Sequence, residues 1–321
     1  MIKYIIKRLL QMLVVLFVVS LVVFIFTNYI GDPISMLLPE DASQEEIQQA
    51  IRRLGLDKPI HVQYGIFVKD ILSGNFGKSY VFSRPALELI IERIPATLEI
   101  VITAMIIAIV LAIPLGVYAG AYPKRRSSKV IMAGSILGIS LPSFWVGMMM
   151  IYIFSVILGW MPASGRGEAI EVFGMRLSIF SMSGWRHIML PALTLALGNI
   201  AMLLRLTRAG MQENMRQDYV KFARAKGVSP KKVLFGHALK NALIPVVTVF
   251  GVRIGQLIAF TTITETIYAW PGMGKLLIDS IYMADRPIIV AYLMLVAVIF
   301  VVINFAVDII YTLIDPRIEL R

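Results

Sequence analysis

Residues 9–30 read LLQMLVVLFVVSLVVFIFTNYI, an apolar run without a charged side chain. A helix needs roughly 20 apolar residues to cross about 30 Å of hydrocarbon, and this stretch is long enough. Lys3, Lys7 and Arg8 precede it, as basic residues precede the apolar core of a secretory signal peptide. However, the run exceeds the ~7–15 residues of such a core and lacks an A-x-A-type cleavage site. We therefore predict a permanent first transmembrane helix within residues 1–30.

Further apolar segments predict an all-α polytopic membrane protein of about six transmembrane helices. The other predicted spans are Ala96–Tyr122, Val130–Leu158, Ile188–Leu206, Leu243–Ile263 and Ile288–Leu313. Hydrophobic residues make up 58% of the 321 residues and charged residues 16%, which is far more apolar than a soluble domain of this size. A soluble fold could not bury so much apolar surface, whereas a bilayer can cover it.

Side chains that carry catalytic or metal chemistry are scarce. The chain has no cysteine, which excludes disulfides, thiolate metal sites and cysteine nucleophiles. His61, His187 and His237 lie far apart, without the spacing of metal ligands. We therefore predict neither catalytic residues nor a metal site.

The basic residues indicate how the chain is oriented, because cytoplasmic loops of membrane proteins carry an excess of Lys and Arg. One side of the predicted topology carries the N-terminal bases, Lys124 to Lys129, the cluster from Arg208 to Lys240, and Arg317. Acids balance the bases on the other side. We predict that both termini are cytoplasmic. The net charge of +11 then follows topology, without the basic stripe and stacking aromatics of a nucleic-acid-binding protein.

The predicted spans divide the chain into four parts. These are the N-terminal segment with the first transmembrane helix (1–30), an extracytoplasmic loop or cap (31–95), a transmembrane core (96–313) that contains a cytoplasmic loop (208–241), and a cytoplasmic tail (314–321).

Within the outer loop, Ser43 and Glu46 form a capping box that predicts an amphipathic helix ending near Gly55. The tripeptide Gly77-Lys78-Ser79 resembles the end of a phosphate-binding loop, but Leu72 occupies the position of that motif's first glycine. We predict no ATP binding there.

The cytoplasmic loop carries signals for two short helices. Asp218–Lys226 predicts a helix that ends at Gly227 as its C′ residue. Ser229 as N-cap and Pro230 at the first helical position predict a second helix, which runs to about Lys240.

Tyr219, Phe222 and Ala223 lie at i, i+3 and i+4, and the spacing predicts one apolar face. Five bases surround this face: Lys221, Arg224, Lys226, Lys231 and Lys232. An amphipathic hairpin on anionic lipid headgroups would have this composition. So would a helix that inserts into a groove on a partner protein. Both interpretations remain open from these residues alone.

Residues 219–227, YVKFARAKG, and 237–245, HALKNALIP, resemble the cytoplasmic "EAA" loop of ABC-importer permeases. Lys221 stands where the broad consensus has glutamate, and the gap from Gly227 to Pro245 is longer. Both departures are typical of the dipeptide/oligopeptide/nickel branch.

Further segments match the same branch in order along nearly the whole chain. They are LGLDKP (54–59), GNFGKS (74–79), LPSFWVG (141–147), PASG (162–165), WPGMG (270–274) and DPR (315–317). Together they resemble the first of the two permease subunits.

This resemblance implies a type I ABC-importer permease fold in a bacterial or archaeal cytoplasmic membrane. It implies a second permease subunit, two ATPase subunits that hold ATP and Mg, an extracytoplasmic solute-binding protein, and a non-catalytic role without cofactors for this chain. The implied substrates are di- and oligopeptides, while nickel or other metal chelates, glutathione-like compounds and oligosaccharides remain alternatives. The resemblance assigns ATPase coupling to Tyr219, Phe222, Ala223, Arg224, Ala225, Lys226, Gly227 and Pro230.

Charges inside spans are expected to be functional or paired. Arg253 lies in the fifth predicted span and Asp308 in the sixth, so we predict an intramembrane pair or a role along the translocation path. A secondary transporter could use them for ion coupling, but the inverted repeats common in that class are not visible. We expect Glu99 and Glu265, near span ends, to reach the membrane interface.

Four tryptophans complete the expectations for the membrane boundary. We expect all of them to be interfacial. They are Trp145, Trp160, Trp185 and Trp270.

Overall fold

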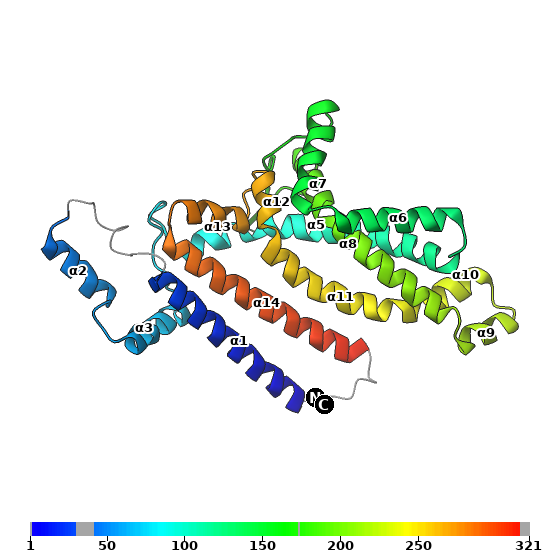
Figure 1. The fold of residues 1–321 in the computed structure, drawn as a ribbon, viewed down its shortest axis with the longest axis horizontal. Helices are drawn as coiled ribbons and strands as arrows, with labels where there is room; N and C mark the ends of the chain where they lie inside the picture. The colour runs from blue at the N-terminus through cyan, green and yellow to red at the C-terminus, as the bar shows by residue number, and fades with distance from the viewer. Residues whose placement is uncertain (1, 30–41, 173, 315–321) are drawn as a thin grey trace. The chain divides into compact units, whose positions relative to one another are not determined.

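The computed structural model describes residues 2–29, 42–172 and 174–314, and helices dominate this part of the chain (Figure 1). Two short strands, β1 (Ile170–Val172) and β2 (Met175–Leu177), form an antiparallel hairpin. The chain divides into two compact units. The first comprises residues 1–94 with 275–302, and the second comprises residues 95–274 with 303–319.

The first unit is built from α1 (Ile2–Tyr29), α2 (Gln44–Leu54), α3 (Ile60–Leu72), α4 (Ala86–Ile91), most of α13 (Met273–Tyr282) and the first part of α14 (Arg286–Ile314). Val23 of α1 packs against Val290 and Met294 of α14 in its core. The capping box at the start of α2 is confirmed, because the Ser43 backbone N–H donates to the Glu46 carboxylate at 2.9 Å and the Ser43 hydroxyl accepts from the Glu46 backbone.

The second unit contains α5 (Ile94–Ala121), α6 (Arg126–Ser140), α7 (Ser143–Met150), η1 (Ile151–Ile157), α8 (Met182–Asn214), α9 (Asp218–Ala225), α10 (Pro230–Lys232), η2 (Val233–Ala238), α11 (Leu239–Phe260) and α12 (Thr262–Ile267). The central helix α8 packs against α6 and α11.

Glycines let α5 approach α8 closely. A Cβ atom added to Gly116 would lie 2.6 Å from Cβ of Thr207, and one added to Gly120 would lie 2.6 Å from Cβ of Met211. Small residues at such crossings are typical of membrane helix pairs, because dispersion contacts replace the missing hydrophobic drive.

In the described residues, five helices are long and apolar enough to cross a membrane, and a bent helix pair raises the number to six. The prediction of about six spans is therefore confirmed. The third span was wrongly predicted to be continuous from Val130 to Leu158, because α6 and the following helix are bent by 105°. The break lies at Leu141, whose backbone is extended (ψ 131°), immediately before Pro142. Proline disfavours helical backbone in the preceding residue, which explains the bend.

The helices around the predicted cytoplasmic loop are longer than predicted. α8 continues to Asn214, and the chain is helical again without a break from Pro230 to Phe260. The predicted helix to about Lys240 and the predicted span from Leu243 are therefore parts of one helix. Pro245 lies inside this long helix, and the helix continues past it although proline has no backbone N–H to donate. Residues 31–41 of the predicted outer loop and 315–321 of the predicted tail lie outside the described residues.

Candidate functional site

The candidate site is the hairpin formed by α9, α10 and the segments beside them, which we predict to be cytoplasmic. α9 ends as the sequence predicted, with Gly227 in the left-handed conformation at φ 76°. The Gly227 N–H donates to the Arg224 carbonyl at 3.0 Å, and the Val228 N–H donates to the Ala223 carbonyl at 3.2 Å. These two bonds form a Schellman motif, so Gly227 fixes the direction in which the chain leaves α9.

One face of α9 is buried against its own chain. Val220 is fully buried and Ala223 is 7% exposed. They pack with Val117 of α5, Met211 of α8 and a group from the following helix: Val233, Ala238 and Ala242. The prediction that Ala223 shares an outward apolar face with Phe222 is therefore wrong. Ala223 lies on the inner face, because its small side chain allows α9 to approach α5 and α8 closely.

The opposite face of α9 is exposed. Phe222 is 62% exposed, and the Lys226 ammonium lies 4.5 Å from the centre of its ring. Other exposed members of the predicted set are Arg224, Ala225, Gly227 and Pro230, and the neighbouring Lys221, Lys231 and Lys232 are exposed as well. α9 thus presents the Phe222 ring surrounded by positive charge, and the Tyr219 ring is 38% exposed as well.

A surface ion pair lies in the first turn of α9. The Lys221 ammonium donates to the Asp218 carboxylate at 2.8 Å, and this hydrogen bond holds the pKa of Asp218 below its ordinary value. A negative charge in the first turn also interacts favourably with the helix dipole.

Tyr219 forms hydrogen bonds that the sequence analysis did not predict. Its hydroxyl donates to the Asn214 side-chain oxygen at 2.7 Å and accepts from the Asn241 amide at 3.0 Å. Asn214 is the last residue of α8, and Asn241 lies in the first turns of α11. Tyr219 therefore ties α9 to both helices that flank the hairpin, although its side chain is still partly exposed.

The helix that follows the hairpin contains a π-helical segment, η2. Val233 and Ala238 are five residues apart and both are buried. In a regular α-helix a spacing of five turns the second side chain away from the first, whereas the wider π turn keeps both on one face. The segment therefore adds a second contact between the helix and the inner face of α9.

Arg253 and Asp308 occupy neighbouring helices, α11 and α14, and both are half-buried. The two helices touch next to these residues, because a Cβ atom on Gly251 would lie 2.5 Å from the Val307 side chain. The close approach is compatible with the predicted pair, which stays a prediction.

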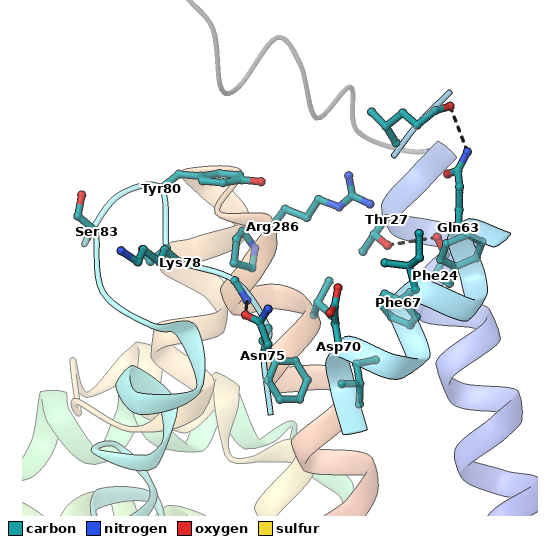
Figure 2. A pocket seen from close by; sticks show the side chains of 18 residues that line it. Phe24, Thr27, Gln63, Phe67, Asp70, Asn75, Lys78, Tyr80, Ser83 and Arg286 are labelled. Atoms are coloured by element: carbon teal, nitrogen blue, oxygen red, sulfur yellow. Dashed lines mark hydrogen bonds between the residues drawn. The ribbon is translucent and has the colours of Figure 1, made fainter. Parts of the chain in front are cut away.

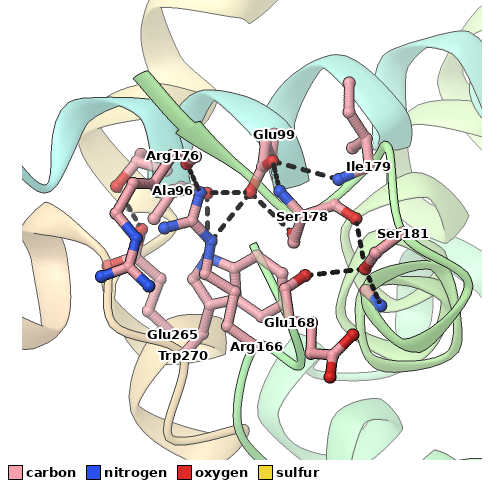
Figure 3. A network of polar contacts seen from close by, with 12 residues as sticks. Ala96, Glu99, Arg166, Glu168, Arg176, Ser178, Ile179, Ser181, Glu265 and Trp270 are labelled. Atoms are coloured by element: carbon pink, nitrogen blue, oxygen red, sulfur yellow. Dashed lines mark hydrogen bonds and ion pairs between the residues drawn. The ribbon is translucent and has the colours of Figure 1, made fainter. Parts of the chain in front are cut away.

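A buried polar network in the second unit was missed by the sequence analysis (Figure 3). The Glu99 carboxylate accepts from Arg166 Nε at 2.9 Å and Nη2 at 2.7 Å. It also accepts from the backbone N–H groups of Ser178 and Ile179 and from the Ser178 hydroxyl. Glu99 is therefore buried beneath the β1–β2 segment, and the prediction that it reaches the interface is wrong.

A second carboxylate, that of Glu265, is also fully buried, contrary to prediction. It accepts from the Thr97 hydroxyl at 2.6 Å, and Gly272 lies so close that any Cβ there would collide with it. Trp270 is buried beside it, with its indole N–H donating to the Ala96 carbonyl at 2.8 Å, so this tryptophan is not interfacial. The other three, Trp145, Trp160 and Trp185, are exposed, and their position at the membrane interface stays a prediction.

Comparisons with known proteins agree along the chain. Residues 112–320 match the family described as binding-protein-dependent transport system inner membrane component, and residues 1–103 match the N-terminal family of the same membrane components. The glutathione transport system permease protein GsiC of Escherichia coli K12 is 37% identical over 322 residues, covering 100% of both chains. The di/tripeptide transport system permease protein DppB of Pseudomonas aeruginosa is 39% identical over 333 residues, covering 99% of each.

A solved structure shares the fold. The inward-facing MetNI methionine ABC transporter superposes with a TM-score of 0.54 at 18% sequence identity. The match covers 71% of this chain and 96% of that one.

Proposed function

The chain belongs to the family of binding-protein-dependent inner-membrane transport components, as the permease of an ABC importer, and we propose that α9 couples it to a separate ATPase subunit. The observation that carries this proposal is the division of α9 into two faces. Val220 and Ala223 fix the helix to the membrane core, while Phe222 and its surrounding bases remain exposed.

The same division argues against a hairpin that rests on lipid headgroups. Such a hairpin would turn its apolar face to the membrane, whereas the apolar face of α9 is already buried within the chain. Phe222 is the large apolar side chain that α9 leaves exposed, and one aromatic anchor with a charged rim is typical of a protein interface.

The proposed coupling mechanism depends on the firm attachment of α9 to the membrane helices. When the partner ATPase subunits close on ATP, they would move α9, and the contacts of Val220, Ala223 and Tyr219 would transmit that movement to α5, α8 and α11. ATP and Mg would be held by the partners, and this chain would be non-catalytic and without a cofactor. A second permease subunit and an extracytoplasmic solute-binding protein would complete the transporter, with lipid around the spans.

Phe222→Ala tests the docking of α9. Burying one aromatic side chain contributes roughly 1.5–3 kcal/mol, so its loss should weaken ATPase binding by about tenfold or more. A tagged chain would be purified in mild detergent from its native host, and both co-purifying ATPase and substrate-stimulated ATP hydrolysis would be measured. Phe180→Ala is the control, because Phe180 is similarly exposed but lies before α8. Normal stimulated hydrolysis in Phe222→Ala would contradict the proposal.

The substrates that we propose are di- and oligopeptides. The names of the two relatives support this class, because glutathione is itself a tripeptide. Uptake of labelled dipeptide into cells that carry or lack this chain tests it, with glutathione, nickel chelate and oligosaccharide as competitors. If only a nickel chelate or an oligosaccharide inhibited uptake, that class of compound would be the substrate instead of peptides.

A further inference from the structure

A cavity of about 690 Å³ lies in the first unit (Figure 2). It is open to one side and is lined by the C-terminal part of α1, by α3, by the segment between α3 and α4, and by the first turns of α14. According to the orientation predicted from the basic residues, this is the outer side of the membrane. Its volume is in the range of small-molecule sites.

One wall of the cavity is aromatic. Phe24 of α1 lies 5.4 Å from Phe67 of α3, measured between ring centres, and Tyr64 lies 5.3 Å from Phe24. Phe24 and Phe67 line the cavity, and Phe76 extends the same wall. Val23, Val290 and Met294 pack behind these rings, so the wall is part of a core and is formed before any ligand arrives.

The opposite wall is held by a buried carboxylate. Asp285 is fully buried and accepts from the Ser79 hydroxyl and from the backbone N–H groups of Tyr80 at 3.2 Å and Val81 at 3.4 Å. These bonds fix the segment after α3 to the start of α14. Lys78, Tyr80 and Arg286 all line the cavity next to this junction.

The cavity contains charges of both signs. Asp70, on the last turn of α3, lines it together with Lys78 and Arg286. Among the residues that the structure describes, neither Asp70 nor Lys78 forms an ion pair with another side chain. Figure 2 shows Arg286 reaching from α14 toward α1, with Asp70 and Asn75 beside the same space.

Tyr80 adds a neutral hydrogen-bonding group. Burial raises the pKa of its phenol, an effect that the nearby Arg286 partly offsets. Tyr80 therefore keeps its proton at neutral pH and can donate to an anion.

These features discriminate between classes of ligand. The Asp70 carboxylate would repel a phosphate-bearing ligand. A divalent cation would find only one carboxylate, next to two positively charged side chains. A neutral sugar would leave the positive and the negative side chains of the cavity without partners of opposite charge. A short peptide with free ends carries one ammonium and one carboxylate, and its side chains can pack on aromatic rings.

We propose that this cavity binds a short zwitterionic peptide, with Asp70 contacting its amino group and Lys78 and Arg286 its carboxylate. The inference rests on the proposed peptide substrate. It adds a site on the permease itself, at which a peptide can be held on the outer side during its transfer.

Binding would be measured by calorimetry on the purified transporter in nanodiscs, without the solute-binding protein. The probes are the dipeptide Ala-Phe, its N-acetyl form and its C-terminal amide. We expect Ala-Phe to bind, and either blocking group to weaken binding about tenfold or more, because each removes a charge-assisted contact.

The variants Asp70→Asn and Lys78→Gln identify the contacts. Asp70→Asn should weaken Ala-Phe about tenfold and should leave the N-acetyl form unchanged, because both changes remove the same interaction. Lys78→Gln should likewise weaken Ala-Phe about tenfold and should leave binding of the C-terminal amide of Ala-Phe unchanged. Glu45→Gln and Lys69→Gln are matched controls, since both residues are exposed and neither lines the cavity.

Absence of Ala-Phe binding to the wild-type transporter, or equal binding by the variants and their controls, would overturn the inference. The comparison of free and blocked peptides on the wild type decides the question even if a variant fails to fold. Uptake of Ala-Phe into proteoliposomes with excess solute-binding protein separates the two proposals. Uptake without cavity binding would refute only this site, and absence of both would refute the peptide substrate.

Discussion

The Tyr219 hydroxyl accepts a hydrogen bond from the Asn241 amide at 3.0 Å and joins α9 to the first turn of α11. The same hydroxyl donates to Asn214 at the end of α8. Movement of α9 would therefore act on two membrane helices through one side chain. This link complements the apolar contacts of Val220 and Ala223, which resist separation but allow sliding.

Tyr219→Phe should weaken coupling with little loss of stability. The ring stays, while two hydrogen bonds worth about 0.5–1.5 kcal/mol each are replaced by bonds to water, because the site is exposed. We expect transport per ATP hydrolysed to fall several-fold. The ratio of uptake to ATP hydrolysis in proteoliposomes measures this effect. Tyr152→Phe, at an exposed position in η1, is the control. An unchanged ratio in Tyr219→Phe would show that the apolar contacts suffice.

Gly116→Ala should destabilise the second unit. The new methyl group would overlap Thr207 on α8, and overpacking of this kind costs about 1–3 kcal/mol. Gly198→Ala is the matched control, because nothing lies within 4 Å of its added Cβ. Alanine also has a higher helix propensity than glycine, so the control substitution should be neutral or stabilising. Apparent Tm values in detergent measure both, and equal values would argue against close packing of α5 on α8.

Removing one partner of the Glu99–Arg166 pair should be strongly destabilising. The side chains are 2% and 13% exposed, and breaking a buried pair costs about 3–5 kcal/mol because the remaining charge is left uncompensated. Glu99→Gln and Arg166→Met should each lower the apparent Tm, and the double variant should lose less than the sum of the two. Glu168→Gln, at an exposed position nearby, is the control. Additive losses would indicate that the two residues act independently.

The start of α2 should depend on pH. Hydrogen bonds from the Ser43 backbone and hydroxyl hold the pKa of Glu46 below its ordinary value. A carboxyl group whose pKa is lowered in the folded state stabilises the fold at pH values above its ordinary pKa. This stabilisation is lost as the pH falls through the lowered pKa. Amide exchange in residues 44–54, corrected for its intrinsic pH dependence, should therefore accelerate relative to α3 as the pH falls below the ordinary carboxyl pKa. Glu46→Gln should abolish this pH dependence, whereas Ser43→Ala, which keeps the backbone bond to Glu46, should only reduce it. A dependence that survives Glu46→Gln would assign it to another group.

Local patterns in the sequence were sufficient to predict many of the helices of this protein and where some of them begin or end. Apolar runs predicted the spans, because the length of a membrane helix is set by bilayer thickness. Gly227 predicted the end of α9, because its left-handed backbone conformation disfavours side chains with a Cβ. Ser43 and Glu46 predicted the start of α2, because a capping box is formed within one helical turn.

Relations between distant residues were decided only by the tertiary structure. The sequence could not assign Ala223 to the inner face of α9, because that depends on how close α5 and α8 lie to it. It could not show that Arg166 reaches Glu99, 67 residues away, or that Asp285 holds the segment around Ser79. An ionisable residue near a span end looks the same in sequence whether water or a distant partner satisfies it. Only the folded chain brings that partner within hydrogen-bonding distance and decides which residues are buried.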